Sequence, residues 1–427
     1  MKHSAIITIA AVLIAAMLCG CAGGPLSADD LIKDTGAGDL MQGVKAVDWP
    51  GPPEQIDAEL QSAMLDFSWR LFRETMGSEG NVLISPTSVY LALAMTMNGA
   101  DGETLTAMTK ALSAQGMSQQ ALNEACRGWI SILRTRTDKT QVSVANSIWF
   151  RQTYDVAEEF LKTNADYYDA GAQALDFDAP EALDTINGWV RDQTQGAIEK
   201  IVKEIEIDSV MFLINAVHFK SDWQTPFDAS VTREGEFAAP GGAVPADFMY
   251  RDGDMIYLDS DGAQGVMLPY DDGRYSFFAL LPPEGADVRE YADELNAAAI
   301  AGLLQAMEPG YVALTLPRFE TRWDDSLKEA LTALGMGIAF DTGRANLSGI
   351  SAQKENELYI GEVLHSAYCR VDEKGTEAAA ATSVEIKARG ALRFDAQICF
   401  DRPFLYGIVD TASLTPLFLG ILENPAQ

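Results

Sequence analysis

The chain has few basic residues, few cysteines and histidines, and only one long apolar run. Of its 427 residues, 31 are Lys or Arg and 62 are Asp or Glu, so the formal net charge is −31. This charge repels phosphate backbones, and we expect no nucleic-acid partner. The apolar run lies at the N-terminus, and no later stretch approaches the roughly 20 residues of a membrane span, which excludes a polytopic membrane protein. Because 48% of the residues are apolar, a disordered acidic polymer is excluded as well.

Residues that could perform catalysis or bind metal are scarce. The chain has three histidines, His3, His218 and His365. It contains no G-x-S-x-G, H-E-x-x-H or G-x-x-x-x-G-K-[ST] motif. We therefore expect neither an enzyme nor a metal or cofactor site, and we interpret His365 as a core histidine. A hydrolase that uses His365 or His218 in a triad assembled from distant residues is the alternative.

Three of the five cysteines lie in the body of the chain, at Cys126, Cys369 and Cys399. No C-x-x-C pair occurs, which argues against zinc and thioredoxin-like sites. We expect buried thiols. A Cys369–Cys399 disulfide is the alternative, because an oxidising compartment would permit it.

The N-terminus has the pattern of an export signal. Residues 1–20 combine a basic start with a short apolar run, and the ending Leu18-Cys19-Gly20-Cys21 resembles a bacterial lipobox. This resemblance implies acylation of Cys21, and hence a lipoprotein held on the membrane of the cell envelope, facing the periplasm or the exterior. An ordinary signal peptide or a single membrane anchor is the alternative.

Residues 21–55 are rich in Gly, Pro and Asp and show no persistent apolar period. The segment is predicted to be a flexible tether that follows the lipidated residue, with a short ordered arm as the alternative.

Residues 56–427 show helical and strand periods in one uninterrupted α+β domain. Ser85-Pro86 is a typical helix start, and Asp271-Asp272-Gly273 between two apolar runs indicates a hairpin. The patterns predict helices over 60–71, 86–98, 103–112, 118–134, 182–193 and 325–334. They predict strands over 142–150, 210–220, 266–270, 275–281, 312–316, 404–409 and 417–422.

The segment 372–390 is unusual because it alternates with period two but has no large side chain to hold a strand. One set of alternate residues is Thr376, Ala378, Ala380 and Thr382, and it continues with Val and Ile. The other set becomes increasingly polar. Taken alone, this pattern is equally consistent with an Ala-rich helical turn followed by a linker.

Six sequence blocks in a fixed order make residues 56–427 resemble the serpins. The blocks are Asn81-Val-Leu-Ile-Ser-Pro-Thr-Ser-Val89, Ala145-Asn-Ser-Ile-Trp-Phe150, Asn215-Ala-Val-His-Phe-Lys-Ser-Asp-Trp223, Leu316-Pro-Arg-Phe319, Ala345-Asn-Leu-Ser-Gly-Ile350, and Asp401-Arg-Pro-Phe404 with Pro416-Leu-Phe-Leu-Gly420. With the lipobox, they indicate a prokaryotic lipoprotein-type member. The resemblance implies one domain with three β-sheets, surrounding helices and an exposed reactive loop at about 373–400.

The resemblance also implies a mechanism. The loop acts as protease bait, and after cleavage its first part enters the main sheet while the protease stays bound as an acyl-enzyme. By position, Arg389 precedes the scissile bond and Gly390 follows it, with Lys387 and Arg393 as competing cleavage points. Arg389 lies 14 residues after the hinge glycine Gly375, which is the family's usual spacing, although the stretch from Arg389 to Pro403 is a few residues longer than usual. The implied hinge residues are Glu373, Gly375, Thr376, Ala378, Ala380 and Thr382.

Two further groups of residues match positions that control sheet opening in the family. The implied sheet-opening cluster is Ser85, Ser88, Asn215 and His365, and the implied insertion-start cluster is Trp223, Arg318 and Glu373 with an Arg318–Glu373 ion pair.

The resulting hypothesis is a monomeric, irreversible inhibitor that forms a covalent complex with a trypsin-like serine protease. A non-inhibitory scaffold lipoprotein and an inhibitor of an Arg-preferring cysteine protease are the alternatives.

Overall fold

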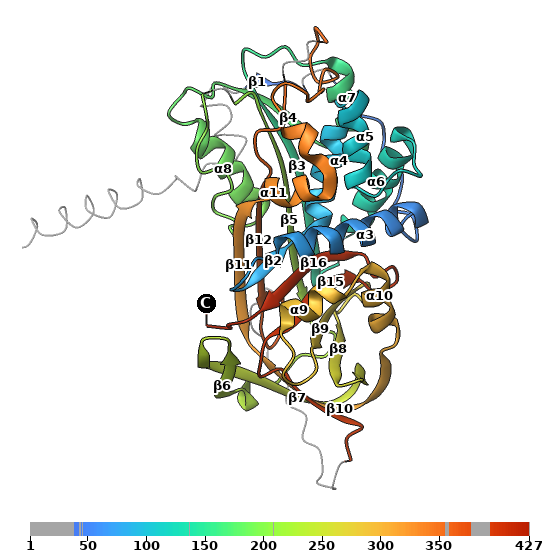
Figure 1. Cartoon of the computed structure of the whole chain (residues 1–427), viewed down its shortest axis with the longest axis vertical. Coiled ribbons are helices and arrows are strands. Elements are labelled where there is room, and N and C mark those ends of the chain that lie inside the picture. The colour runs from blue at the N-terminus through green and yellow to red at the C-terminus, as the bar shows by residue number, and fades with distance from the viewer. Residues whose placement is uncertain are drawn as a thin grey trace, which may run out of the picture.

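The fold is organised by two β-sheets, of which one runs along the molecule's long axis (Figure 1). This computed structural model describes residues 38–41, 44, 46–135, 137–207, 209–354, 358–376 and 393–426. Cys21, Ala378, Ala380, Thr382, Arg389 and Gly390 lie outside the described residues.

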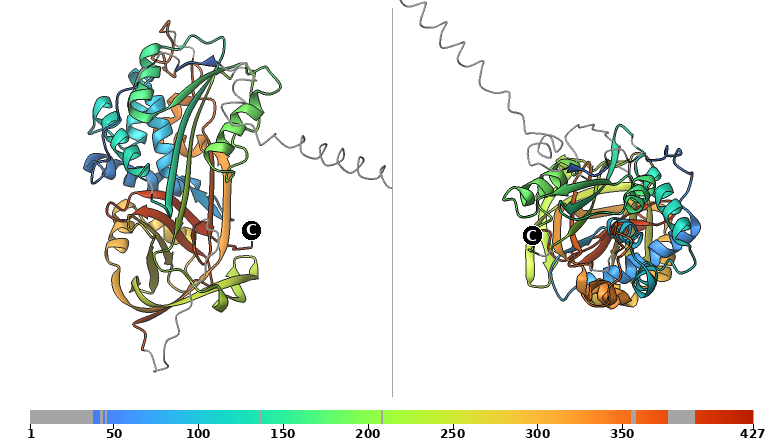
Figure 2. Two further views of the ribbon diagram at one scale, coloured as in Figure 1. Left: turned by 180° about the vertical axis from the view of Figure 1, so that it is seen from behind. Right: turned by 90° about the horizontal axis from the view of Figure 1, so that it is seen from above.

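The long sheet has seven strands in the order β1-β4-β3-β5-β13-β12-β11. Its strands are β1 (Gly38–Asp39), β3 (Thr140–Arg151), β4 (Gly171–Leu175), β5 (Met211–Asp222), β11 (Phe319–Ser326), β12 (Leu364–Val371) and β13 (Gly375–Thr376). Helix α8 packs on one face of this sheet, and helix α4 contacts β5 from the opposite face (Figure 2). The central strand predicted over 210–220 is therefore covered on both sides, as its continuous apolar character requires.

The second sheet has nine strands and bends where one very long strand passes through it. Its order is β14-β10-β7-β8-β9-β15-β16-β2, with β6 attached to β7. The strands are β2 (Val82–Ile84), β6 (Arg233–Ala239), β7 (Gly242–Ser260), β8 (Ala263–Pro269), β9 (Tyr275–Leu281), β10 (Glu308–Pro317), β14 (Ala396–Cys399), β15 (Phe404–Asp410) and β16 (Pro416–Leu422). The start of β7 pairs with β6 and its end with β8, so the two parts of this bent sheet and the long sheet make the expected three β-sheets.

The helices gather around the upper half of the long sheet in Figure 1 and beside the second sheet. They are α3 (Ala58–Thr75), α4 (Pro86–Met97), α5 (Gly102–Ala111), α6 (Gln119–Leu133), α7 (Glu158–Tyr168), α8 (Ala182–Gln193), α9 (Val288–Glu294), α10 (Ala297–Gln305) and α11 (Lys328–Leu331). As predicted, Ser85 caps α4, and its side chain accepts a hydrogen bond from the Ser88 amide. This is an α+β fold in one domain.

The helix predicted over 325–334 begins later than expected. Asp325 and Ser326 extend β11, where they pair with His365 and Leu364 of β12. The α-helix covers only Lys328–Leu331 and continues as a π turn in which Gly335 has φ 98°. Strand pairing overrides local helix propensity here, and the left-handed glycine ends the regular helix.

Part of the segment predicted to be a tether packs on the body. Strand β1 extends the long sheet beyond β4, and the Val47 amide donates to Asp166 at 2.9 Å. The Arg134 guanidinium lies over the Trp49 ring. For the described residues of this segment, the ordered-arm alternative therefore applies.

The cysteines of the body are thiols, and Cys126 and Cys369 are buried as expected. The expectation of burial is wrong for Cys399, which is exposed. The Cys369–Cys399 disulfide that the sequence left open is thus not formed. Within the described ranges, no helix is both long enough and apolar enough to cross a bilayer.

Candidate functional site

The site lies where the chain enters the long sheet between two parallel strands. Gly375 and Thr376 form β13, which pairs with Asp222 and Ser221 of β5 on one side and with Val371 of β12 on the other. Among the residues that the structure describes, no ladder pairs β5 directly with β12. The two strands are therefore bridged only at the end where β13 enters.

Gly375 is required at this point by close packing against β5. A Cβ atom at this position would lie 2.0 Å from the Ser221 carbonyl oxygen and 2.8 Å from the Asp222 Cα. Because both contacts involve backbone atoms, a larger residue could be accommodated only if β13 moved out of the sheet.

Thr376 is already an interior residue, with only 2% of its surface exposed. Its hydroxyl lies 2.7 Å from the Tyr270 hydroxyl in a buried hydrogen bond. Burial raises the pKa of Tyr270 well above its usual value, so its hydroxyl stays protonated. The sequence predicted a loop that starts exposed. The structure differs at Gly375 and Thr376, because both residues are small enough to enter the sheet between β5 and β12.

Trp223 anchors the turn that leads into β13. Its indole nitrogen donates to the Asp372 carbonyl at 2.8 Å, and its amide donates to the Lys374 carbonyl at 2.6 Å. Its ring stacks on Tyr270 with 4.7 Å between centroids. One buried indole thus holds both the backbone of the turn and the tyrosine that binds Thr376.

Glu373 connects the same turn to the second sheet. One of its carboxylate oxygens accepts from the Thr232 hydroxyl at 2.8 Å, and the other lies 3.7 Å from the Arg318 guanidinium. The ion pair between Arg318 and Glu373 that the sequence predicted is therefore present. Arg318 also pairs with Asp247 of β7.

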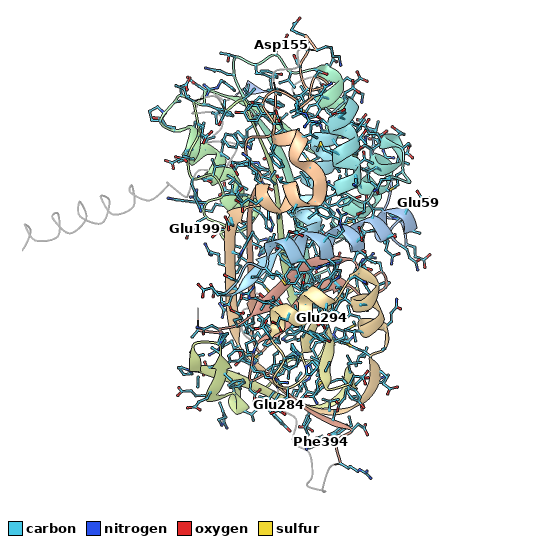
Figure 3. All side chains as sticks on the ribbon, viewed as in Figure 1. Glu59, Asp155, Glu199, Glu284, Glu294 and Phe394 are labelled. Atoms are coloured by element: carbon cyan, nitrogen blue, oxygen red, sulfur yellow. The ribbon has the colours of Figure 1, made fainter. Side chains whose placement is uncertain are left out.

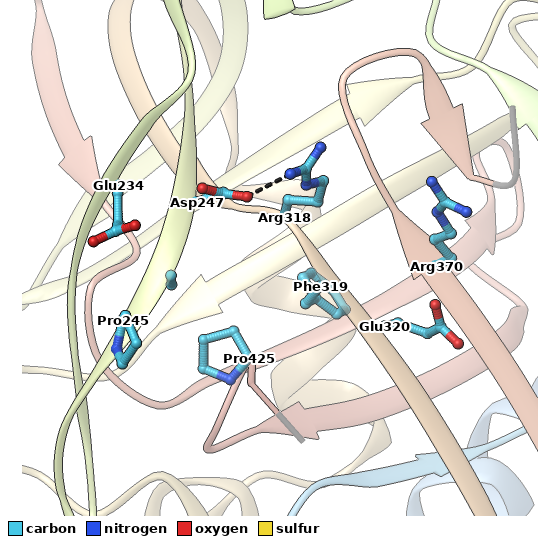
Figure 4. A pocket seen from close by; sticks show the side chains of 9 residues that line it. Glu234, Pro245, Asp247, Arg318, Phe319, Glu320, Arg370 and Pro425 are labelled. Atoms are coloured by element: carbon cyan, nitrogen blue, oxygen red, sulfur yellow. Dashed lines mark hydrogen bonds and ion pairs between the residues drawn. The ribbon is translucent and has the colours of Figure 1, made fainter. Parts of the chain in front are cut away.

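A cavity of about 570 Å³ opens beside Arg318, between the β6–β7 hairpin and strands β11 and β12 (Figure 4). It is lined by Glu234, Pro245, Ala246, Asp247, Arg318, Phe319, Glu320, Arg370 and Pro425. Both arginines are occupied, since Arg318 pairs with Asp247 and Glu373, and Arg370 with Asp372 at 3.4 Å. The two arginines thus connect the wall of the cavity to Asp372 and Glu373 of the turn.

A second polar cluster lies deeper in the molecule, at the opposite end of β12. His365 is buried, with 5% exposure, and its Nε2 accepts a hydrogen bond from the Ser85 amide at 2.9 Å. Burial lowers the pKa of His365 to about 4, so the ring is neutral and Nε2 can accept. Because a backbone amide occupies this nitrogen, it cannot serve as a general base.

The described residues of the sheet-opening cluster and of the insertion-start cluster lie together in the structure, each cluster at its own end of β12. Ser85, Ser88 and His365 lie together, and Asn215 lies in β5 opposite Asn146, but its side chain is outside the described part. Sequence reasoning missed Tyr270 and Thr232. Their contacts with the hinge span 106 and 141 residues, and no local pattern signals such a distance.

Comparison with known proteins identifies the family. Residues 62–425 match the family model described as "Serpin (serine protease inhibitor)". A serpin-like protein of Thermococcus kodakarensis is 33% identical over 368 residues, which are 85% of this chain and 85% of that protein. Human serpin B9 is 30% identical over 81% of this chain and 93% of its own length. This chain therefore belongs to the serpin family, whose members are generally protease inhibitors and not enzymes.

Solved structures agree with this assignment. The native state of the thermophilic serpin tengpin superposes with a TM-score of 0.84 at 36% identity, covering 91% of this chain and 99% of that one. The latent state of the same protein gives 0.76 at 34% identity, covering 86% and 98%. The fold described here is thus more similar to the native than to the latent form.

The buried His365 predicts a pH-dependent stability. Because its pKa is about 4 in the folded chain and 6.5 when unfolded, the unfolded state binds the proton more readily. The stability is fully present above pH 6.5, and about 3 kcal/mol is lost as the pH falls to about 4. Urea unfolding at pH values from 7.5 to 4 should show this fall in the free energy of unfolding. In His365→Asn the fall should be about 3 kcal/mol smaller, because the titrating group is absent. Parallel pH profiles of the two proteins would contradict the assignment.

Gly375→Ala should expel β13 from the sheet, because the added Cβ meets backbone atoms of β5. We expect faster hydrogen exchange at the Trp223 amide and altered Trp223 fluorescence. Gly361→Ala is a matched control, since its Cβ would meet no atom within 4 Å. If Trp223 responds equally to both substitutions, or to neither, the packing argument is wrong.

Proposed function

We propose that this serpin irreversibly inhibits a trypsin-like serine protease by cleavage at Arg389, trapping of the acyl-enzyme and insertion of the loop into the long sheet. The supporting observation is β13, a two-residue strand that already pairs with both β5 and β12. It gives insertion a starting point and a fixed register.

The register of β13 supports insertion of the residues that follow. If the pairing of Thr376 with Ser221 and Val371 continues, Ala378 would reach Phe219 and Cys369. Two steps later, Thr382 would reach Asn215 and His365. Residues 365, 367, 369 and 371 of β12 are buried, so the inward positions of the new strand would be the small ones in the sequence. The inserted strand would thus reach the polar cluster around His365 at Thr382.

The free energy that insertion would release is comparable to the stability of a protease domain. A new central strand adds roughly ten ladder hydrogen bonds at about 1 kcal/mol net each. Burial of its inward side chains adds several kcal/mol at about 25 cal/mol per Å². The sum, on the order of 10–20 kcal/mol, is comparable to the roughly 5–15 kcal/mol that stabilises a typical protease domain. Insertion could therefore distort the tethered protease and slow deacylation.

The choice of protease rests on Arg389. An arginine before the scissile bond fits a specificity pocket with an aspartate at its base, as in trypsin.

We also propose that acylation of Cys21 holds the inhibitor on the envelope membrane. A thioether-linked diacylglycerol with a further acyl chain would anchor it stably, whereas one chain alone would not.

Arg389→Ala should abolish inhibition of trypsin, because the pocket would lose its cationic ligand. Incubation of the wild type with trypsin should give a covalent adduct that survives denaturing electrophoresis, and mass spectrometry of the released fragment should place the cut after residue 389. Lys387→Ala is the matched control and should still form the adduct. Undiminished inhibition by Arg389→Ala would show that the scissile bond does not follow residue 389.

Thr376→Arg should convert the inhibitor into a substrate. A charge cannot enter the buried position beside Tyr270 without a large desolvation cost, so hydrolysis of the acyl-enzyme would outrun insertion. Thr376→Ser, which keeps the hydroxyl and the small volume, should still inhibit. The ratio of cleaved to complexed protein on a gel measures this partition. An equal ratio in Thr376→Arg and wild type would rule out the insertion mechanism.

A further inference from the structure

In the part of the second sheet formed by β14, β10 and β7, the outward residues of one face are exposed or half-buried. This face lies next to the point where the described chain resumes after the loop. Alternate residues of β10 and β14, such as Leu314 and Ile398, are buried. The residues between them face outward, as do Tyr250, Asp252 and Asp254 of β7. The register confirms a shared face, because Asp254 is opposite Tyr311 and Asp252 is opposite Ala313.

The outward residues combine carboxylates with aromatic rings. We define the acidic face as Tyr250, Asp252, Asp254, Tyr311, Phe394 and Asp395. Tyr250 is 38% exposed, one of the few large apolar side chains that are. The Tyr311 ring stacks on Phe394, with 5.7 Å between centroids and 8° between planes.

Hydrogen bonds from Tyr311 hold two of these carboxylates in place. The Tyr311 hydroxyl donates to Asp252 at 2.8 Å, and the Tyr311 amide donates to Asp395 at 2.8 Å. Among the ion pairs of the described residues, none involves Asp252, Asp254 or Asp395. Arg393 adds one positive charge beside Phe394, and the Arg251 guanidinium is engaged elsewhere, over the Phe227 ring. Asp252 and Asp395 are therefore fixed, and the charge of the acidic face is mostly uncompensated.

The position of the acidic face along the chain restricts what can bind to it. Arg389 and Phe394 are five positions apart, and a chain of this length spans at most about 18 Å. A standard protein–protein contact buries about 800 Å² per partner, which corresponds to a patch of about 16 Å radius. A protease that holds Arg389 in its active site can therefore reach the acidic face. Figure 3 shows Phe394 at one end of the molecule, far from Glu59 and Glu199.

We propose that the acidic face is a second contact surface for the attacking protease and that it favours enzymes with Lys or Arg beside the leaving-group side of the cleft. This inference rests on the proposed function and adds the charge of the partner. Fixed carboxylates accelerate encounter with a basic surface, and an arginine can also lie over the Tyr250 ring. A second copy of this chain fits poorly, because its own carboxylates would meet those of the first, although β14 is a sheet edge.

The test compares binding of two trypsins, cationic and anionic, that share a preference for Arg. Both are used with the catalytic serine replaced by alanine, so that association is measured without acylation. The variant Asp252→Asn/Asp254→Asn/Asp395→Asn keeps the hydrogen-bond acceptors and removes three charges. Its matched control, Glu59→Gln/Glu199→Gln/Glu204→Gln, makes the same change in net charge away from the face. Thermal melting verifies that both variants fold.

We expect the first variant to bind cationic trypsin about tenfold more slowly at low salt, with a shallower salt dependence. The association rate of this variant with anionic trypsin should change little. The control variant Glu59→Gln/Glu199→Gln/Glu204→Gln should bind both trypsins at nearly the wild-type rate. Equal slowing by both variants would indicate bulk charge alone and overturn the proposal, as would no slowing at all.

Incubation with active trypsin separates this inference from the proposed function. The first variant should still form the covalent adduct at saturating concentration, because Arg389 and the hinge are intact. The wild type could form no adduct while the Asp→Asn variant still associates more slowly with cationic trypsin. That result would contradict the trapping mechanism and support the contact surface.

Discussion

The structure depends on one constraint: β5 and β12 run parallel, yet among the described residues only the two residues of β13 bridge them. Backbone donors and acceptors in a sheet interior need partners, so such a sheet gains much from one more strand. Every feature of the site is related to this gap. Gly375 and Thr376 are small enough to enter it, Tyr270 binds the first inserted side chain, and the neutral His365 lies where an inserted strand would arrive.

The contacts that hold the turn before β13 differ in strength. The hydrogen bonds of Trp223 to the turn are buried and short, so they fix the backbone firmly. The Arg318–Glu373 pair is partly exposed at 3.7 Å, and pairs of this kind contribute about 0–1 kcal/mol. The turn is therefore held by a firm anchor on one side and a weak one on the other, at the point where the proposed insertion would begin.

Local patterns predicted the elements whose residues carry strong signals. Ser85-Pro86 at the start of α4, the apolar run of β9 and the Asp271-Asp272-Gly273 hairpin were all correct. The 19-residue length of β7 was not predictable, because its exposed half contains Gly and several Asp residues that disfavour strands and are held there by pairing with β6 and β10. The start of α11 was wrong for a similar reason, since Asp325 and Ser326 pair with β12.

By itself, the sequence determined the family, the acidic character of the molecule, the alternation of small residues after Gly375 and the arginine at 389, because each is a property of composition or of short spacing. Tertiary structure alone decided that Thr376 meets Tyr270, that the Trp223 indole donates to the Asp372 carbonyl, and that Tyr250, Tyr311 and Phe394 share one face. These contacts join residues from about 60 to 150 positions apart. They depend on strand register and sheet order, which no local pattern encodes.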